Sequence, residues 1–243
     1  MAPPGIGDRV EGVHAVAAAL EAGRVRRLAV ERGRVDALAA IIDGAERRGI
    51  AIDLVEDVRG NATTDAPQGV VAECRPIEPV SLDEAVAAGE PASLVVLDHV
   101  EDPRNVGAIA RSAVAAGITA LVVAGRRAAP LGATAFKAAA GALERLAITE
   151  VSSIANAVAD LRRLDVWVVA LDAGGDRSLF GLDLLAEPVA LLLGAEGQGV
   201  SRLARERADV VASIPLVGPI ESLNASVAAA LAMYEVARVR GRV

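Results

Sequence analysis

The sequence IPLVGPIESLNASVAAALAMYEVAR, residues 214–238, decides how the rest of the chain is read. It begins as a short apolar run, passes a glycine–proline pair and continues as a long alanine-rich segment. Ser222 and Asn224 lie where that segment begins, and such side chains accept hydrogen bonds from the free N–H groups of a helix's first turn. Apolar residues then recur at i, i+4 and i+7: Val227, Leu231 and Tyr234. We predict a strand end, a polar loop and a capped helix over Leu223–Arg240. By itself this is also the pattern of an ordinary surface helix.

A second polar loop, LLLGAEGQGVSR, occupies residues 191–202. The apolar run Val189–Leu193 predicts a buried strand, and three glycines follow it. Glycines after a strand let the backbone approach a ligand closely, and the next helix offers its N-terminus. The spacing matches neither G-x-G-x-x-G nor G-x-x-x-x-G-K-[ST], which argues against a nucleotide-dependent enzyme of the Rossmann type.

A third stretch, LVVLDHVEDPRNVGAIARSAVAAG, occupies residues 94–117. It predicts an apolar strand, a turn and a helix. Asn105 and Arg111 are six residues apart, so they lie at different levels of that helix. A guanidinium beside a polar turn suits a phosphate. Alternatively, Arg111 forms a structural ion pair with Asp98 or Asp102.

These three stretches, in this order, resemble the three motifs of the SpoU/TrmH family of RNA ribose 2′-O-methyltransferases. The motifs are N-x-G-x-x-x-R at 105–111, G-A-E-G-x-G at 194–199 and I-P-L-x-G-x-x-E-S-L-N-x-S-V-A at 214–228. The resemblance is close over residues 92–243. The first part, through about residue 76, is similar, more loosely, to the small substrate-recognition domain of the ribosomal-RNA branch. It carries V-x-G-V-H-A-V near the start and Q-G-V-V-A at 68–72.

The resemblance implies a catalytic set. Arg111 would contact the phosphate beside the target ribose and help activate its 2′-hydroxyl, while Asn105 would fix the motif turn and the substrate. Glu196 would orient Arg111 or the ribose. Ser222 and Asn224 would shape the active loop.

It also implies S-adenosylmethionine as the cofactor, held largely by backbone groups, and no metal. By family position the cofactor-binding residues are Gly194, Ile214, Leu216, Gly218 and Leu223. Family members tie the C-terminal part of the sheet into a deep trefoil knot and act as homodimers, so we expect both here.

Composition restricts the class of protein. The 243 residues are 53% apolar, enough for a sizeable core, and no apolar run reaches the roughly 18 residues of a membrane span. The N-terminus lacks the charged start and apolar stretch of a signal peptide. The single cysteine, Cys74, lies in the apolar run 70–74 and is expected to be a buried strand residue. One cysteine favours a reducing compartment, so we expect a cytoplasmic protein.

The net charge of −7 argues mildly against an RNA partner, but the distribution of charge matters more than its sum. Residues 77–91 carry four acidic residues and no basic one, whereas residues 24–34 carry five arginines and one glutamate. These arginines either bind RNA phosphates or form a solvated face. The RNA-binding candidates are Arg24, Arg26, Arg27, Arg32, Arg34 and Lys137.

From residue 92 onward, apolar runs alternate with helical patterns, which predicts an α/β fold with a parallel sheet covered on both faces. The expected strands are 94–97, 120–123, 166–171, 189–193 and 210–214. The expected helices are 105–116, 134–143, 154–163, 200–207 and 223–240. Upstream we expect helices at 13–21 and 36–48 and strands at 25–30, 51–55 and 70–74. The predicted domains are a small α/β RNA-binding domain (1–76), a linker (77–91) and a knotted methyltransferase domain (92–243).

The leading hypothesis is S-adenosylmethionine-dependent 2′-O-methylation of a ribose in RNA, with guanosine in large-subunit ribosomal RNA as the expected target. A transfer-RNA ribose methyltransferase is one alternative. A non-catalytic RNA-binding protein on the same scaffold is another, although the catalytic candidates are all intact.

Overall fold

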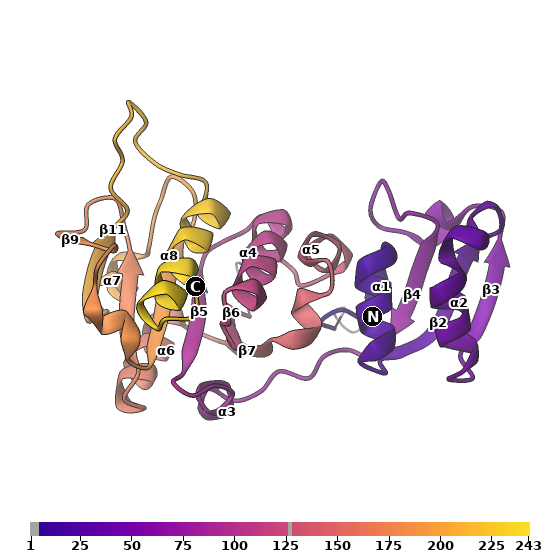
Figure 1. Ribbon diagram of the computed structural model, residues 1–243, viewed down its shortest axis with the longest axis horizontal. Coiled ribbons are helices and arrows are strands. Elements are labelled where there is room, and N and C mark those ends of the chain that lie inside the picture. Colours follow the sequence, from indigo (N-terminus) through magenta and orange to yellow (C-terminus); the bar gives the residue numbers. More distant parts are fainter. Residues whose placement is uncertain (1–4, 126–127) are drawn as a thin grey trace. The chain divides into compact units, whose positions relative to one another are not determined.

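The computed structural model describes residues 5–125 and 128–243, and the chain forms two compact units (Figure 1). Unit 1 contains the residues up to Glu78 together with Pro130–Arg145. Unit 2 contains Pro79–Ala129 and Leu146–Val243. The segment 130–145 was expected within the C-terminal domain, but its contacts lie in unit 1. The Gly7 N–H, for example, donates to the Leu131 carbonyl at 2.9 Å.

Unit 1 is built on a four-stranded sheet in the order β1-β4-β2-β3. Strands β2 and β3 are parallel, and β4 is antiparallel to both of its neighbours. The strands are β1 (Arg9–Glu11), β2 (Val25–Glu31), β3 (Ala51–Val55) and β4 (Val70–Cys74), and the helices are α1 (Val13–Glu21), α2 (Ala39–Glu46) and α5 (Ala133–Ala139). The helix expected over 36–48 begins as a 3₁₀ turn and becomes α-helical only at Ala39.

Unit 2 contains a seven-stranded sheet in the order β7-β6-β5-β10-β8-β11-β9, and every neighbouring pair is parallel. The strands are β5 (Ser93–Asp98), β6 (Ala120–Ala124), β7 (Ala147–Val151), β8 (Trp167–Leu171), β9 (Arg177–Ser178), β10 (Val189–Gly194) and β11 (Val210–Ser213). The predicted parallel sheet is confirmed. The interiors of its central strands β5 and β10 are apolar because helices cover both of their faces.

Two helix layers bury this sheet. Side chains of α6 (Ile154–Arg163) and α7 (Arg202–Arg207) share a core with alternate residues of the strands, such as Val96 and Leu192. On the opposite face α8 (Ala225–Val239) packs on β10 and beside α4 (Pro103–Ala115) (Figure 1). No helix in the two described ranges is long and apolar enough to cross a membrane.

The structure differs from the expected elements in several places. Strand β7, with the sequence AITEV, lies at the sheet edge. The expected linker holds α3 (Leu82–Ala87), which begins with a reciprocal capping box between Ser81 and Glu84. Helix α5 ends at Ala139, short of the expected residue 143, because Ala140 adopts the left-handed backbone conformation (φ 49°).

Parallel strands bring their carboxyl ends to one edge of the sheet. In the order β5-β10-β8-β11 these ends are Asp98, Gly194, Leu171 and Ser213. The segments that follow three of these strands, β5, β10 and β11, carry the three sequence motifs. Ligands of open parallel sheets bind at this edge.

Candidate active site

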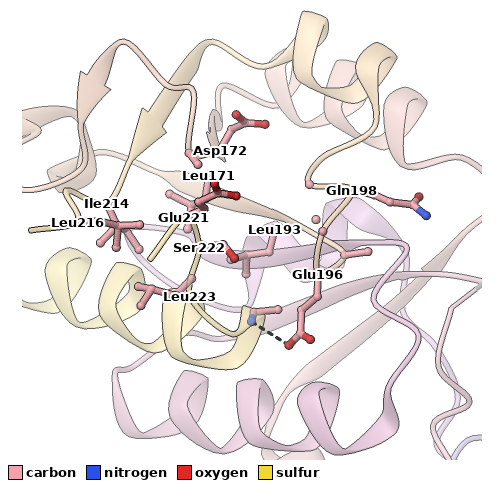
Figure 2. A pocket seen from close by; sticks show the side chains of 17 residues that line it. Leu171, Asp172, Leu193, Glu196, Gln198, Ile214, Leu216, Glu221, Ser222 and Leu223 are labelled. Carbon is pink, nitrogen blue, oxygen red and sulfur yellow. Dashed lines mark hydrogen bonds between the residues drawn. The ribbon is translucent and has the colours of Figure 1, made fainter. Parts of the chain in front are cut away.

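A cavity of about 460 Å³ opens at the carboxyl ends of β8, β10 and β11 (Figure 2). This volume lies within the range typical of small-molecule sites. Apolar side chains of Ile214, Leu216 and Leu223 lie on one side, and Glu196 and Gln198 on the other. The remaining lining residues are Leu171, Asp172, Ala173, Leu193, Gly194, Ala195, Gly197, Gly199, Glu221, Ser222, Ala225 and Ala228.

The glycine loop after β10 folds back tightly on itself. The Gly199 N–H donates to the Ala195 carbonyl at 2.9 Å. A Cβ placed on Gly194 would lie 1.9 Å from the carbonyl carbon of Gly199, which no side chain could tolerate. Gly197 has φ 78°, a conformation that favours glycine. The glycines therefore allow the loop backbone itself to form a cavity wall.

Side chains from all three motif stretches meet in one hydrogen-bond network beside this cavity. Glu196 Oε1 accepts from Asn105 Nδ2 at 3.0 Å and from Asn224 Nδ2. Asn224 Nδ2 also donates to Asn105 Oδ1 at 3.1 Å. Asn224 is in turn the N-cap of α8, where its Oδ1 accepts from the N–H groups of Ser226 (2.9 Å) and Val227 (3.4 Å).

Arg111 is exposed on α4, and it forms none of the ion pairs found among residues 5–125 and 128–243. The two carboxylates considered as its structural partners are occupied elsewhere. Asp98 is fully buried, where it accepts from the Ser201 N–H and contacts His99 Nδ1, both at 2.7 Å. Asp102 caps α4 by accepting from the Arg104 N–H at 2.8 Å. The guanidinium of Arg111 is thus available to a ligand.

Two family models match the chain. Residues 92–234 match the model of the SpoU rRNA Methylase family, and residues 9–80 match the model described as RNA 2′-O ribose methyltransferase substrate binding. The first match alone covers more than half of the 243 residues.

The chain belongs to the SpoU rRNA methylase family.

Curated SpoU relatives match over nearly the whole chain. The 23S rRNA (guanosine-2′-O-)-methyltransferase RlmB of Xylella fastidiosa (strain 9a5c) is 38% identical over 95% of this chain and 96% of its own length. The protein of the same name from Escherichia coli (strain K12) is 35% identical over 96% of this chain and 99% of its own. Among solved structures, the SpoU methyltransferase AviRb from Streptomyces viridochromogenes, in complex with the cofactor AdoMet, has a TM-score of 0.81. It is 29% identical over 97% of this chain and 91% of its own.

Most of the residues expected at a SpoU cofactor site line the cavity: Gly194, Ile214, Leu216 and Leu223, together with Glu196 and Ser222 from the catalytic set. Asn105 and Asn224 border it through the Glu196 network. Gly218 is exposed in the loop before α8 and does not line the cavity. Within the described ranges, no cluster of three or more His, Cys, Asp or Glu side chains could hold a metal ion.

Sequence reasoning missed Asp172 and His99, which follow the buried strands β8 and β5. Asp172 lines the cavity, accepts from the Gly174 N–H at 2.8 Å and lies 3.6 Å from Arg205 Nε. His99 has φ 59° and lines a neighbouring cavity of about 240 Å³ together with Asn105 and Glu196. Only their positions in the sequence could have identified these two residues. A polar residue directly after an apolar parallel strand lies at the ligand-binding edge of the sheet.

The RNA-binding candidates lie in unit 1, and several already have partners there. Arg24 is held inside the unit by Glu144, whose Oε2 is 2.8 Å from Arg24 Nε, and its guanidinium lies over the Phe136 ring. Lys137 Nζ donates to Thr64 Oγ1 and to the Ala66 carbonyl. The further ion pairs in this set are Arg27–Asp53 and Arg32–Glu56.

Arg26 and Arg34 are exposed and take part in none of the ion pairs of the described residues. The five arginines of residues 24–34 therefore differ in their freedom to bind a phosphate. Arg24 could bind one only by breaking its pair with Glu144.

Elsewhere in the unit, Cys74 is buried, and burial raises the pKa of its thiol to about 12, so it is a core residue.

Proposed function

We propose that this protein is an S-adenosylmethionine-dependent RNA ribose 2′-O-methyltransferase that modifies a guanosine in large-subunit ribosomal RNA. The observation that carries the proposal is the Asn105–Glu196–Asn224 network beside a cavity of cofactor size. The names of the full-length relatives support both the reaction and the RNA. A ribose methylase needs a cofactor pocket and a polar site for one hydroxyl, and this arrangement offers both.

The cavity suits the proposed cofactor. Ile214, Leu216 and Leu223 offer an apolar wall for the flat adenine ring of S-adenosylmethionine. The carboxylates of Asp172 and Glu221 suit the positively charged sulfonium and amino groups of the cofactor. The glycine loop exposes backbone groups on the opposite side because Gly194 has no side chain. When bound, S-adenosylmethionine supplies a methyl group that its sulfonium has already activated, so the protein needs to add only alignment and proton removal.

The residues around the network perform the alignment in our proposal, and the proton of the 2′-hydroxyl passes to water or to the phosphate beside the ribose. The Arg111 guanidinium binds the phosphate beside the target ribose. Asn105 and Glu196 hydrogen-bond the ribose and hold its 2′-hydroxyl toward the cavity, while Ser222 and Asn224 keep the loop before α8 in place. Alignment of two reactants can contribute an effective molarity of up to about 10⁵–10⁸ M, so positioning is a large contribution to the rate.

The proposed active form is a homodimer. Three apolar side chains on α8 remain exposed by 47%, 39% and 45%: Val227, Leu231 and Tyr234. They form the stripe predicted from the sequence, and the other face of α8 already packs on α4 and β10. A second copy of this helix would bury the stripe, and a self-complementary contact of this kind gives a two-fold dimer.

The trefoil knot also remains a proposal. Two features support a closely wound C-terminal part. The backbone at Gly194 passes the backbone at Gly199 with no room for a Cβ. After β11 the chain returns through α8, whose last turn brings Arg240 to the carbonyls of Pro91 (3.2 Å) and Ala92 (3.1 Å), before β5.

We further propose that unit 1 selects the RNA and that unit 2 binds the cofactor. The match of residues 9–80 to a substrate-binding model supports this division. All six RNA-binding candidates stay predictions, and we favour Arg26 and Arg34 as phosphate contacts because they form none of the ion pairs of the described residues. A cytoplasmic location also stays a prediction.

The test is methyl transfer in vitro. The purified protein is incubated with S-adenosylmethionine and unmodified 23S ribosomal RNA or transfer RNA, and the digested nucleosides are identified by mass spectrometry. We expect 2′-O-methylguanosine from the ribosomal RNA alone. Methylation of transfer RNA alone would move the protein to that substrate class, and binding of RNA without transfer would make it a non-catalytic binding protein.

A further inference from the structure

The arginines of unit 1 divide into two sets. Five of them form ion pairs with carboxylates: Arg24, Arg27, Arg32, Arg59 and Arg145. The others have no carboxylate partner among the described residues: Arg9, Arg26, Arg34, Arg47, Arg48 and Arg75. In a protein of net charge −7, an arginine without a counter-charge marks a local excess of positive charge.

Three arginines of the second set line one surface depression of about 670 Å³. Arg26 lies near the start of β2, Arg48 follows α2, and Arg75 directly follows β4. The other lining residues are Gly23, Val25 and Ile50, so no carboxylate lines the depression. All three guanidinium-bearing residues are exposed.

Backbone carbonyls hold two of these side chains in place. Arg48 Nη1 donates to the Gly44 carbonyl at 3.0 Å, and Arg75 Nη2 donates to the Gly23 carbonyl. A carbonyl orients a guanidinium without neutralising its charge. Because each guanidinium has five N–H donors, most donors of Arg48 and Arg75 remain for a ligand.

We propose that Arg26, Arg48 and Arg75 form a binding site for the phosphates of the RNA backbone. The inference rests on the proposed function and deepens it, because it names the contact surface and its chemistry. A guanidinium matches a phosphate bidentately, and three of them along one depression suit successive phosphates of a strand. An arginine already paired with a carboxylate attracts a phosphate less, because the carboxylate beside it carries a negative charge that repels the phosphate.

The test is the salt dependence of RNA binding by the full-length protein, with poly(U) as a probe that carries phosphates but no specific sequence. Each phosphate contact to a single strand contributes about 0.7 to the slope of log K against log salt. The triple variant Arg26→Ala/Arg48→Ala/Arg75→Ala should therefore lower the magnitude of that slope by about 2. The matched control is Arg27→Ala/Arg32→Ala/Arg59→Ala, which removes the same charge from paired positions and should leave the slope within about 0.5.

An unchanged slope in the first variant, or an equal loss in the control, would overturn the inference. So would wild-type protein that binds inorganic phosphate but not poly(U). Thermal unfolding of both variants shows that they are folded, and cofactor binding should stay within twofold in each. If wild-type protein binds poly(U) with the expected slope but never transfers a methyl group, the proposed reaction fails while the phosphate site stands.

Discussion

Asn224 Nδ2 lies 3.1 Å from Asn105 Oδ1, although the two residues are 119 positions apart in the chain. The contact joins the first turn of α4 to the N-cap of α8, and Glu196 from the loop after β10 accepts from both amides. The side-chain oxygen of Asn224 caps α8, while its amide nitrogen donates to Glu196 and Asn105. The same side chain thus stabilises the helix and takes part in the candidate active site. Substitutions can separate these two roles.

Asn224→Asp should keep the helix cap and lose the network. Aspartate caps helices as well as asparagine does, but it places a carboxylate beside Glu196 instead of a donor. We expect kcat/KM for RNA methylation to fall at least a hundredfold while Tm stays within a few degrees. Asn224→Ala should lower both, since loss of an N-cap costs about 1 kcal/mol. Wild-type activity of Asn224→Asp would mean that the side chain acts only as a cap.

Gly194→Ala should abolish cofactor binding. The added methyl would lie 1.9 Å from the Gly199 carbonyl carbon, so the loop that walls the cavity must move. Gly218→Ala is the matched control, because nothing lies within 4 Å of a Cβ placed there and Gly218 does not line the cavity. Calorimetric titration with S-adenosylmethionine should show no binding for the first variant and wild-type affinity for the second. Normal affinity of Gly194→Ala would place the cofactor elsewhere.

Unit 1 should depend on the ion pair between Arg24 and Glu144, whose side chains are only 11% and 4% exposed. Removing one partner leaves a buried charge alone, so Arg24→Met or Glu144→Gln should cost roughly 3–5 kcal/mol of unfolding free energy. The double variant should recover part of that loss. Urea unfolding measures all three, and strict additivity of the two single losses would show that the pair has no coupling.

Glu11 should make the stability of unit 1 pH-dependent. Burial raises the pKa of its carboxyl, but hydrogen bonds from Thr64 and Thr63 outweigh burial and leave that pKa below its usual value. The Thr63 N–H (2.6 Å), Thr63 Oγ1 (2.9 Å) and Thr64 N–H (3.0 Å) are among the donors. A lowered folded-state pKa stabilises the unit above the ordinary glutamate pKa of about 4.3, and this stability is lost as the pH falls through the folded-state value.

The matched variant is Glu11→Gln, which keeps the shape of the side chain and removes its titration. It should be less stable than wild type at pH 7, and the difference should shrink steadily below about pH 4.3. Urea unfolding at a series of pH values measures both curves. A difference that stays constant with pH would show that the charge of Glu11 does not contribute.

The sequence predicted the sheet of unit 2 because apolar runs such as LVVL and ALLL, separated by helical patterns, are typical of parallel strands covered on both faces. The network residues were expected from the resemblance to the SpoU/TrmH motifs, and they meet because each motif follows such a strand. It could not predict β7, whose AITEV mixes polar and apolar residues as an edge strand does. Nor could it show that Glu144 lies beside Arg24, since pairing over 120 residues depends on the fold and leaves no local pattern. For the same reason the sequence could not distinguish the arginines of residues 24–34 that have a carboxylate partner from those that do not.

The central claim is that the protein transfers a methyl group from S-adenosylmethionine to a ribose 2′-hydroxyl of ribosomal RNA, with Arg111 and the network residues positioning the substrate. The most direct measurement compares wild type with Arg111→Ala in binding S-adenosylmethionine and in forming alkali-resistant linkages in 23S ribosomal RNA, since a 2′-O-methyl group blocks alkaline cleavage. We predict equal cofactor affinity, one resistant linkage for the wild type and a loss of at least a hundredfold in its rate of formation for Arg111→Ala. Equal rates in both proteins, or no resistant linkage with either, would contradict the claim.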